Sequence, residues 1–224
     1  MKPVGILGGM GPEATILLMQ KVLGAVAAKD DADHIPLIVH QNPQVPSRIR
    51  RLLEGQGDDP GPVLAAMARD LQAAGASALA MPCNTAHAYA PRIRAATDLP
   101  FLDMRQATVN QLQSLGAGRR IGLLASPGVR VTSAFDAAFE QAGFTAVWPK
   151  DEGPVLALIR QIKAGEVGAA QQSALRDAAE RLAPQCDHLL VACTELSLIA
   201  PAITLPWTDS LDCLAQAILA FSRS

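Results

Sequence analysis

The sequence predicts an α/β protein with two similar lobes, each a mainly parallel four-stranded sheet flanked by helices, and a cleft between the lobes. Two observations support this fold class. Apolar, β-branched runs alternate along the chain with helical patterns, which is typical of parallel sheets with helical crossovers. The order of these elements then repeats in the second half of the chain.

In the first half, short apolar runs indicate strands, and apolar residues that recur every three or four positions indicate helices. Pro12 suits the first turn of a helix, and Gly75 suits the end of one. The expected strands are 3–9, 35–42, 76–83 and 99–104, and the expected helices are 12–28, 61–74 and 85–97.

The second half follows the same scheme, except that two helices follow its second strand. The expected strands are 120–128, 144–149, 188–193 and 203–209. The expected helices are 131–142, which ends at Gly143, then 153–164, 168–182, a short helix after 193, and 210–222.

Three short signatures of the first half return in the same order in the second half. "VGILGGMGP" (4–12) matches "IGLLASPGV" (121–129), "MPCNT" (81–85) matches "VACTE" (191–195), and "LPFLDM" (99–104) matches "LPWTDS" (205–210). We interpret this repeat as two lobes related by pseudo-twofold symmetry. Ligands of open α/β sheets bind beyond the carboxyl ends of the strands. Facing lobes would therefore bring Cys83 and Cys193 to opposite sides of one cleft.

Composition excludes several classes of function. The chain has 224 residues, of which 50% are hydrophobic and 18% charged, with a net charge of -2. This balance argues against a nucleic-acid-binding surface. No apolar run approaches the length of about 20 residues that a membrane span needs. The start "MKPVGILGG" does not resemble a signal peptide, so we expect a cytoplasmic protein with neither nucleic-acid nor membrane partners.

The cysteines at 83, 186, 193 and 213 show no C-x-x-C spacing. We therefore expect free thiols and no zinc or other metal site. Cys186 and Cys213 are expected to be structural, because neither takes part in the repeat.

Cys83 and Cys193 each stand where a helix is expected to begin. Asn84 or Thr85 would cap the first of these helices and Thr194 the second. A helix N-terminus lowers the pKa of a thiol, so both thiols would titrate near neutral pH. Two close thiolates repel, so the pair would share one proton. One cysteine could then remove a proton from a carbon while the other delivers a proton to the opposite face.

Such a carbon acid also needs donors for the charge that develops on its carboxylate. Backbone N–H groups in the turns 8–15 and 125–128 and in the two cysteine turns are candidates. The hydroxyls of Thr85, Ser126 and Thr194 would add to them.

The motifs "GILGGMGPEAT", "NPQVPSR", "MPCNTAH" and "ACTELSL" resemble the aspartate/glutamate racemase family, within the cofactor-independent Asp/Glu/hydantoin racemase superfamily. The resemblance covers essentially the whole chain. It implies a racemase of aspartate and/or glutamate that uses neither pyridoxal phosphate nor a metal, with Cys83 and Cys193 as catalytic acid and base. It also implies substrate contacts from Met10, Asn84, Thr85, Ser126 and Thr194.

In the aspartate racemases that this chain resembles, an Arg and a Lys hold the side-chain carboxylate of the substrate. They correspond to Arg48 and Lys163. Such racemases usually carry Asp where this chain has Ser47, and that Asp would orient both cations. The true substrate among amino acids therefore stays open.

The resemblance further implies that the last helix crosses back to the first lobe, and that a homodimer is possible. The N-terminal lobe would then comprise 1–98 plus 208–224, and the C-terminal lobe 99–207.

Parts of the sequence also fit other functions. "GMGPEA" (9–14) fits a dinucleotide-binding turn, but no acid follows the second strand, which ends "VHQN" (39–42). A hydantoin racemase, maleate isomerase or decarboxylase acting on another small carboxylic acid is an alternative within the same superfamily, and a non-enzymatic small-acid-binding module is a third. Two cysteines together with Arg48 favour racemisation. His87 either tunes Cys83 or has a capping or packing role.

Overall fold

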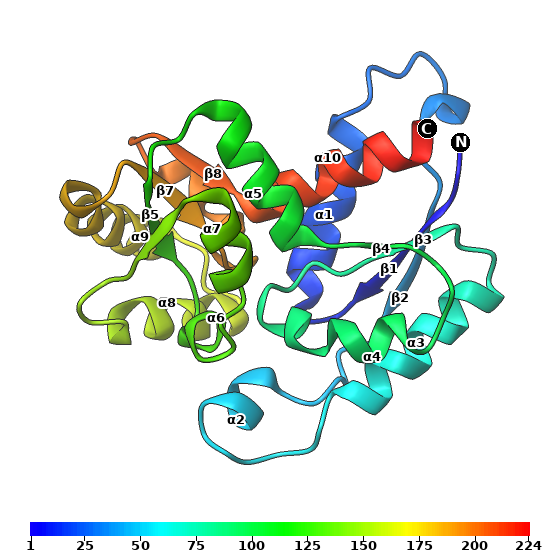
Figure 1. Ribbon diagram of the computed structural model, residues 1–224, viewed down its shortest axis with the longest axis horizontal. Helices are drawn as coiled ribbons and strands as arrows, with labels where there is room; N and C mark the ends of the chain where they lie inside the picture. The colour runs from blue at the N-terminus through cyan, green and yellow to red at the C-terminus, as the bar shows by residue number, and fades with distance from the viewer.

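The computed structural model describes all residues 1–224 and contains two lobes that lie side by side (Figure 1). The strands are β1 (Val4–Gly8), β2 (Leu37–Gln41), β3 (Ala78–Ala80), β4 (Phe101–Leu102), β5 (Arg120–Leu124), β6 (Thr145–Val147), β7 (His188–Val191) and β8 (Trp207–Asp209). One four-stranded sheet has the order β2-β1-β3-β4 and the other β6-β5-β7-β8. All pairings are parallel. The predicted fold class is confirmed, and the shared strand order is the structural form of the sequence repeat.

Helices cover both faces of the N-terminal sheet. The helices are α1 (Pro12–Gly24), α3 (Gly61–Ala73), α4 (Ala90–Arg94) and the C-terminal α10 (Ser210–Arg223). Leu18 of α1 and Ile218 of α10 pack with Val4 and Ile6 of β1 on one face. Leu64 and Leu71 of α3 pack with Leu7 and Leu79 on the other face. Every residue of β1 is buried, which explains its continuous apolar run.

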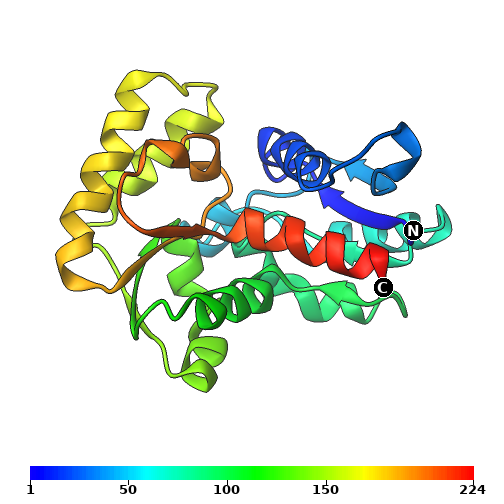
Figure 2. The ribbon, with the colours of Figure 1, turned by 90° about the horizontal axis from the view of Figure 1, so that it is seen from above.

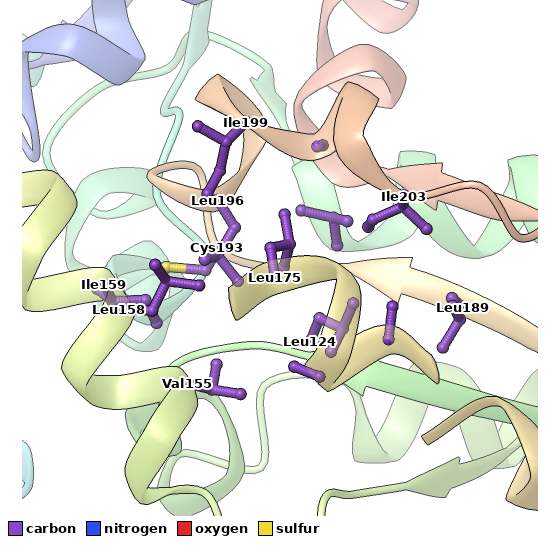
Figure 3. Packing of buried hydrophobic residues seen from close by; sticks show 14 of the residues in the cluster. Leu124, Val155, Leu158, Ile159, Leu175, Leu189, Cys193, Leu196, Ile199 and Ile203 are labelled. Carbon is purple, nitrogen blue, oxygen red and sulfur yellow. The ribbon is translucent and has the colours of Figure 1, made fainter. Parts of the chain in front are cut away.

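The C-terminal sheet is covered in the same way. Its helices are α5 (Met104–Leu115), α6 (Pro127–Val131), α7 (Asp136–Ala142), α8 (Gly153–Lys163) and α9 (Ala169–Leu182). Residues of α5 and α7 pack on one face of this sheet and residues of α8 and α9 on the other. Figure 3 shows Cys193 in the second of these clusters, close to Leu158 and Ile159 of α8.

The last helix joins the two lobes. It begins directly after β8 in the C-terminal lobe and runs along the N-terminal lobe, ending near the N-terminus (Figure 2). Leu211, Leu214 and Ile218 are fully buried against the N-terminal sheet. Full burial of each such side chain contributes about 1.5–3 kcal/mol. The crossing back that the resemblance implied is therefore present.

The sheets place the lobe boundary differently from the sequence prediction. Residues 99–104 were assigned to the C-terminal lobe, but Phe101 and Leu102 pair with β3 and so belong to the N-terminal sheet. Residues 208–224 were assigned to the N-terminal lobe, but Thr208 and Asp209 pair with β7. Backbone pairing decides which sheet a strand belongs to, and each sheet takes four consecutive strands of the chain.

Several helices also differ from the expected ranges. Three helices were not predicted, namely α2 (Arg48–Leu52), α5 and α6. The expected helix 85–97 consists of a 3₁₀ segment, Thr85–Tyr89, followed by α4. The expected helix 131–142 forms only as the shorter α7, which begins after Ser133, a residue with a φ of 50°. Further 3₁₀ segments are Asp31–Asp33, Ala183–Gln185, Leu196–Leu198 and Ala200–Ala202.

None of these helices combines the length and the apolar character that crossing a membrane would require.

Candidate active site

One cavity of about 360 Å³ lies where the carboxyl ends of strands from both sheets meet, and both Cys83 and Cys193 line it. Cys83 follows β3 and Cys193 follows β7, the equivalent strand of the other sheet. This is the crevice in which parallel α/β sheets bind ligands. The predicted site residues that line the cavity are Met10, Arg48, Cys83, Thr85, Ser126, Lys163 and Cys193.

The turn after β1 forms one wall of the cavity. Gly9 has φ +92°, and a Cβ atom there would lie 2.4 Å from the backbone carbon of Asn42. Its N–H donates to the Thr15 hydroxyl over 2.9 Å. A side chain at Gly9 would therefore displace the turn. This turn holds Met10, which is almost fully buried, against the cavity.

His87 holds the backbone of Cys83 in place. The His87 Nδ1 lies 2.8 Å from the Cys83 carbonyl oxygen. The Met104 backbone N–H donates to His87 Nε2 over 3.2 Å, so Nε2 is unprotonated and Nδ1 donates to the carbonyl. Burial lowers the pKa of His87 to about 4, although Asp103 opposes the shift. His87 is therefore neutral near pH 7, and it bonds the backbone of Cys83 rather than its sulfur.

The Cys193 thiol has a carboxylate partner. Its S–H donates to Glu195 Oε2 over 3.1 Å, and both residues are buried. Burial raises the pKa of Cys193 well above its ordinary value, Glu195 raises it further, and Lys163 opposes the shift. The expectation that both thiols titrate near neutral pH is thus wrong for Cys193. The residues that follow it form only the short 3₁₀ segment Leu196–Leu198, whose dipole is too small to outweigh burial and a neighbouring carboxylate.

Lys163, at the end of α8, forms an ion pair with Glu195 Oε1. Burial acts to lower the pKa of Lys163, but Glu195, Cys193 and Cys83 outweigh burial and raise it. Lys163 therefore lies in the cavity as predicted, but a carboxylate of the protein already neutralises its charge.

Arg48 is the cation of the cavity that has no carboxylate partner. Its Nη1 donates to the carbonyls of Val45 and Pro46, over 3.2 and 2.9 Å. Its Nε is buried and has no hydrogen-bond partner. Ser47 does not orient Arg48, because its hydroxyl accepts the Arg50 N–H at the start of α2.

Asn84 and Thr194 do not line the cavity. The Asn84 side-chain amide donates to the Ser210 hydroxyl over 2.9 Å, and the Thr194 hydroxyl donates to the Pro82 carbonyl over 3.2 Å. Neither caps the segment that follows it, contrary to expectation, because the Asn84 side chain bonds to the start of α10 and the Thr194 side chain to the other cysteine motif. The Thr194 bond ties the two cysteine motifs together. The substrate contacts expected of Asn84 and Thr194 stay a prediction.

Thr85 and Ser126 line the cavity from the two lobes. A Cβ atom at Gly128 would lie 2.9 Å from Thr85 Cγ2, so a glycine at the start of α6 permits this close approach of the lobes. Ser126 also caps α6 by accepting the Gly128 N–H over 3.3 Å.

Sequence reasoning missed two carboxylates of the cavity, Glu13 and Glu195. Glu195 stands two positions after Cys193 in "ACTEL", and an acid so close to a candidate thiol is a signal that could have identified it. Glu13 lies in the first turn of α1, where an acid is common.

All four cysteines are free thiols. The structure contains no group of three or more His, Cys, Asp or Glu side chains arranged to hold a metal ion. The Gly-rich turn that resembles a dinucleotide-binding motif lines the same cavity as the thiols, through Gly9, Met10, Gly11 and Pro12.

Comparisons with known proteins agree with this architecture. The family model described as Asp/Glu/Hydantoin racemase matches residues 7–218. The broad specificity amino-acid racemase RacX of Bacillus subtilis (strain 168) is 27% identical over 222 residues, which cover 96% of this chain and 95% of that protein.

Two solved structures show the same fold. The aspartate racemase of Picrophilus torridus superposes with a TM-score of 0.86 and 26% identity, covering 100% of this chain and 95% of the other. The glutamate racemase of Francisella tularensis subsp. tularensis SCHU S4, in complex with D-glutamate, gives a TM-score of 0.68 at 14% identity, covering 98% and 80%.

Proposed function

Because the chain belongs to the Asp/Glu/hydantoin racemase family and is therefore a racemase, we propose that it racemises α-amino acids with Cys83 and Cys193 as its two acid–base groups and without a cofactor. The resemblance seen in the sequence motifs is confirmed at the level of the family. The substrate and the two-cysteine mechanism are our proposal.

The observation that carries this proposal is the position of the thiols. Cys83 and Cys193 come from different lobes, line one cavity, and are each 8% exposed. A substrate α-carbon held between them would meet one sulfur on each face. A carbon held in one orientation is inverted by such an arrangement, because a single fixed base returns a proton to the face from which it took one.

In each turnover, a thiolate takes the α-proton, so that the C–H bond breaks and an S–H bond forms. The electron pair passes into the substrate carboxylate, and the other thiol gives its proton to the opposite face of the carbon. One general acid or base contributes about 10²–10⁴-fold to such a step. The N-terminal turn of α1 and the hydroxyls of Thr85 and Ser126 are suited to bind the carboxylate as its charge grows.

We propose a substrate range wider than aspartate and glutamate. Arg48 supports binding of a carboxylate, because no acidic side chain of the protein pairs with it. Lys163, the expected second cation, is already paired with Glu195, and Ser47 supplies no charge. An acidic side chain thus gains one free cation rather than two. The similar protein from Bacillus subtilis is named a broad specificity amino-acid racemase, which is consistent with this range.

The test uses purified protein, no added cofactor and a panel of pure D- and L-amino acids with acidic and uncharged side chains in heavy water. Chiral chromatography and α-deuterium content are followed. We expect inversion with deuterium uptake in the product, and loss of inversion by about 10²–10⁴-fold in Cys83→Ala and in Cys193→Ala. Cys186→Ser is the matched control, because this cysteine lies away from the cavity. Wild-type rates in both alanine variants would refute the mechanism.

A homodimeric state and a cytoplasmic location remain proposals, based on the resemblance and on the sequence.

A further inference from the structure

The chain passes from the C-terminal lobe to the N-terminal lobe between two consecutive residues, Asp209 and Ser210. Asp209 is the last residue of β8 and pairs with Val191 of β7, whereas Ser210 begins α10, which packs on the N-terminal sheet. Both residues are buried. A buried polar side chain is costly unless it is hydrogen-bonded. The partners of these two side chains therefore bear on how the lobes are joined.

Ser210 holds the cysteine motif of the N-terminal lobe. The side-chain amide of Asn84, the residue after Cys83, donates to the Ser210 hydroxyl over 2.9 Å. The Asn84 Oδ1 atom is buried and has no hydrogen-bond partner, so the Asn84 side chain bonds to Ser210 alone. Loss of the Ser210 hydroxyl would leave a buried amide without any partner. The residue next to the Cys83 thiol would then lose its anchor.

Asp209 holds the cysteine motif of the C-terminal lobe. Its Oδ1 accepts the Ser197 hydroxyl over 2.8 Å, and Ser197 lies in the 3₁₀ segment that follows Cys193. The Leu196 N–H of that segment donates to the Cys193 carbonyl over 2.9 Å. The same Asp209 oxygen accepts the Leu211 N–H over 2.8 Å. The Cys193 motif is thus attached to the first turn of α10.

Helix α1, whose first turn lines the cavity, is attached to the same place. Lys21 of α1 lies with its Nζ 3.5 Å from Asp209 Oδ2, and it also pairs with Asp212 of α10. The start of α10 therefore contacts three parts of the cavity wall, namely α1 and the two cysteine motifs.

We propose that Asp209 and Ser210 are positioning residues of the racemase, which set the separation of the two thiols across the cavity. A single trans peptide bond joins these residues, so their Cα atoms are about 3.8 Å apart. The anchors of the two cysteine motifs therefore have a spacing that covalent geometry fixes. This inference rests on the proposed two-thiol racemisation, and neither residue lines the cavity itself.

The polar character of these contacts favours positioning over stabilisation. A buried hydrogen-bonded pair can be replaced by apolar groups of the same shape with little change in stability. A hydrogen bond, however, has a defined direction and partner, and a fully satisfied buried network specifies one arrangement. Proton transfer depends on such an arrangement, because a displacement of about 1 Å can lower a rate about 10²-fold.

The first test measures kcat, KM and the urea midpoint of Ser210→Ala and Ser197→Ala. Each variant should lose about 10–10²-fold in kcat with a smaller change in KM, because the cavity side chains remain and only a thiol is displaced. Ser197→Ala removes a bond of the other lobe, so it tests the proposal independently where Ser210→Ala does not fold.

Ser222→Ala is the matched control on the same helix. Ser222 is buried at the other end of α10, and its hydroxyl donates to the Lys2 carbonyl over 2.8 Å. This variant should lower the urea midpoint about as much as Ser210→Ala and keep the wild-type kcat. Equal kcat values in Ser210→Ala and Ser222→Ala would overturn the proposal.

The second test separates the two thiols by the primary isotope effect on kcat/KM for each enantiomer deuterated at the α-carbon. This effect grows as removal of the α-proton becomes more rate-limiting. Displacement of Cys83 slows removal of the proton from one enantiomer and its delivery to the product of the other. Ser210→Ala should therefore raise the isotope effect for one enantiomer and lower it for the other, and Ser197→Ala should give the opposite pattern.

A loss of folded protein alone leaves both isotope effects unchanged. Unchanged isotope effects, or the same pattern in both variants, would rule out the positioning role. Racemisation by the wild type that neither substitution slows would refute this role and leave the proposed function intact. A wild-type protein that racemises no amino acid would refute the proposed function and this inference with it.

Discussion

Two buried titrating groups, His87 and Asp209, are expected to give the stability of this racemase opposite dependences on pH over the same range. Burial lowers the pKa of His87 to about 4 from its ordinary 6.5. Burial raises the pKa of Asp209 to about 6 from 3.8, although the Leu211 N–H and Lys21 oppose the shift. Replacing each residue in turn should therefore expose the contribution of the other.

The sign for each group follows from which state binds more protons. Between pH 4 and 6.5, unfolded His87 binds a proton that the folded state refuses, so its contribution destabilises the fold as pH falls. Between pH 3.8 and 6, folded Asp209 keeps a proton that the unfolded state releases, so its contribution destabilises the fold as pH rises. Each shift of somewhat more than two pH units corresponds to about 3 kcal/mol.

In the wild type, the two contributions nearly cancel between pH 4 and 6. In His87→Gln, the Asp209 contribution remains, and the free energy of unfolding should fall by up to about 3 kcal/mol as pH rises from 4 to 6. In Asp209→Asn, the His87 contribution remains, and the free energy of unfolding should fall by a similar amount as pH drops from 6 to 4. Glutamine suits position 87 because it can still donate to the Cys83 carbonyl and accept the Met104 N–H.

The assay is urea unfolding of the three proteins at several pH values from 4 to 7, with the free energy extrapolated to water. The slope against pH is the readout, because each substitution also changes the absolute stability. His188, whose pKa burial lowers, contributes equally to all three proteins. Slopes of the same sign in the two variants would refute the reasoning, and so would variant slopes equal to that of the wild type.

Three further predictions concern the cavity and its walls. Arg48→Ala should raise KM about 10-fold or more for acidic amino acids, and less for uncharged ones, because a carboxylate loses its free cation; equal loss for both classes in steady-state kinetics would remove this role. Gly9→Ala should destabilise the fold by at least about 2 kcal/mol in urea unfolding, since its Cβ would meet the Asn42 backbone at φ +92°; an unchanged midpoint would contradict the geometry. Thr194→Val should lower the free energy of unfolding by about 1 kcal/mol, because the hydrogen bond to the Pro82 carbonyl is lost. Its kcat should also fall more than that of surface variants that leave stability unchanged. A wild-type kcat would show that this hydrogen bond does not position the thiols.

The two-lobed fold was predictable because the apolar pattern of the sequence shows strands alternating with helices and shows this order twice. The runs that became β1 and β7 are buried over nearly their whole length. Helix α5 was not predicted, because its sequence is largely polar and its apolar face is narrow. Its start depends on the Asp103 carboxylate, which accepts the Arg105 N–H, and its end on Gly116, at φ +61°. A single capping residue or glycine predicts a helix less well than apolar residues that recur at helical spacing over many positions.

The parts of the site where the structure differs from the sequence prediction depend on contacts between residues that are distant in the sequence. Asn84 and Thr194 have typical capping side chains, but their partners lie 126 and 112 residues away. Glu195 pairs with Lys163, which lies 32 residues earlier. A pattern read along the chain places the residues of a motif on a strand or turn, but it does not determine which distant groups their side chains meet.

The repeat also explains why the two thiols need not be chemically equal. The two enantiomers of a substrate are mirror images at the α-carbon, yet the site that holds their carboxylate and side chain is a single asymmetric surface. The two sulfurs therefore approach the carbon from different environments, and each environment must be tuned separately. Glu195 in one motif and Thr85 in the other are the side chains that differ at the equivalent position next to the sulfurs. Thr85→Glu together with Glu195→Thr exchanges these two side chains. If the difference between the thiols arises from this position, iodoacetamide should alkylate Cys83 of this variant with a higher pH midpoint than Cys193, as measured by peptide mass mapping.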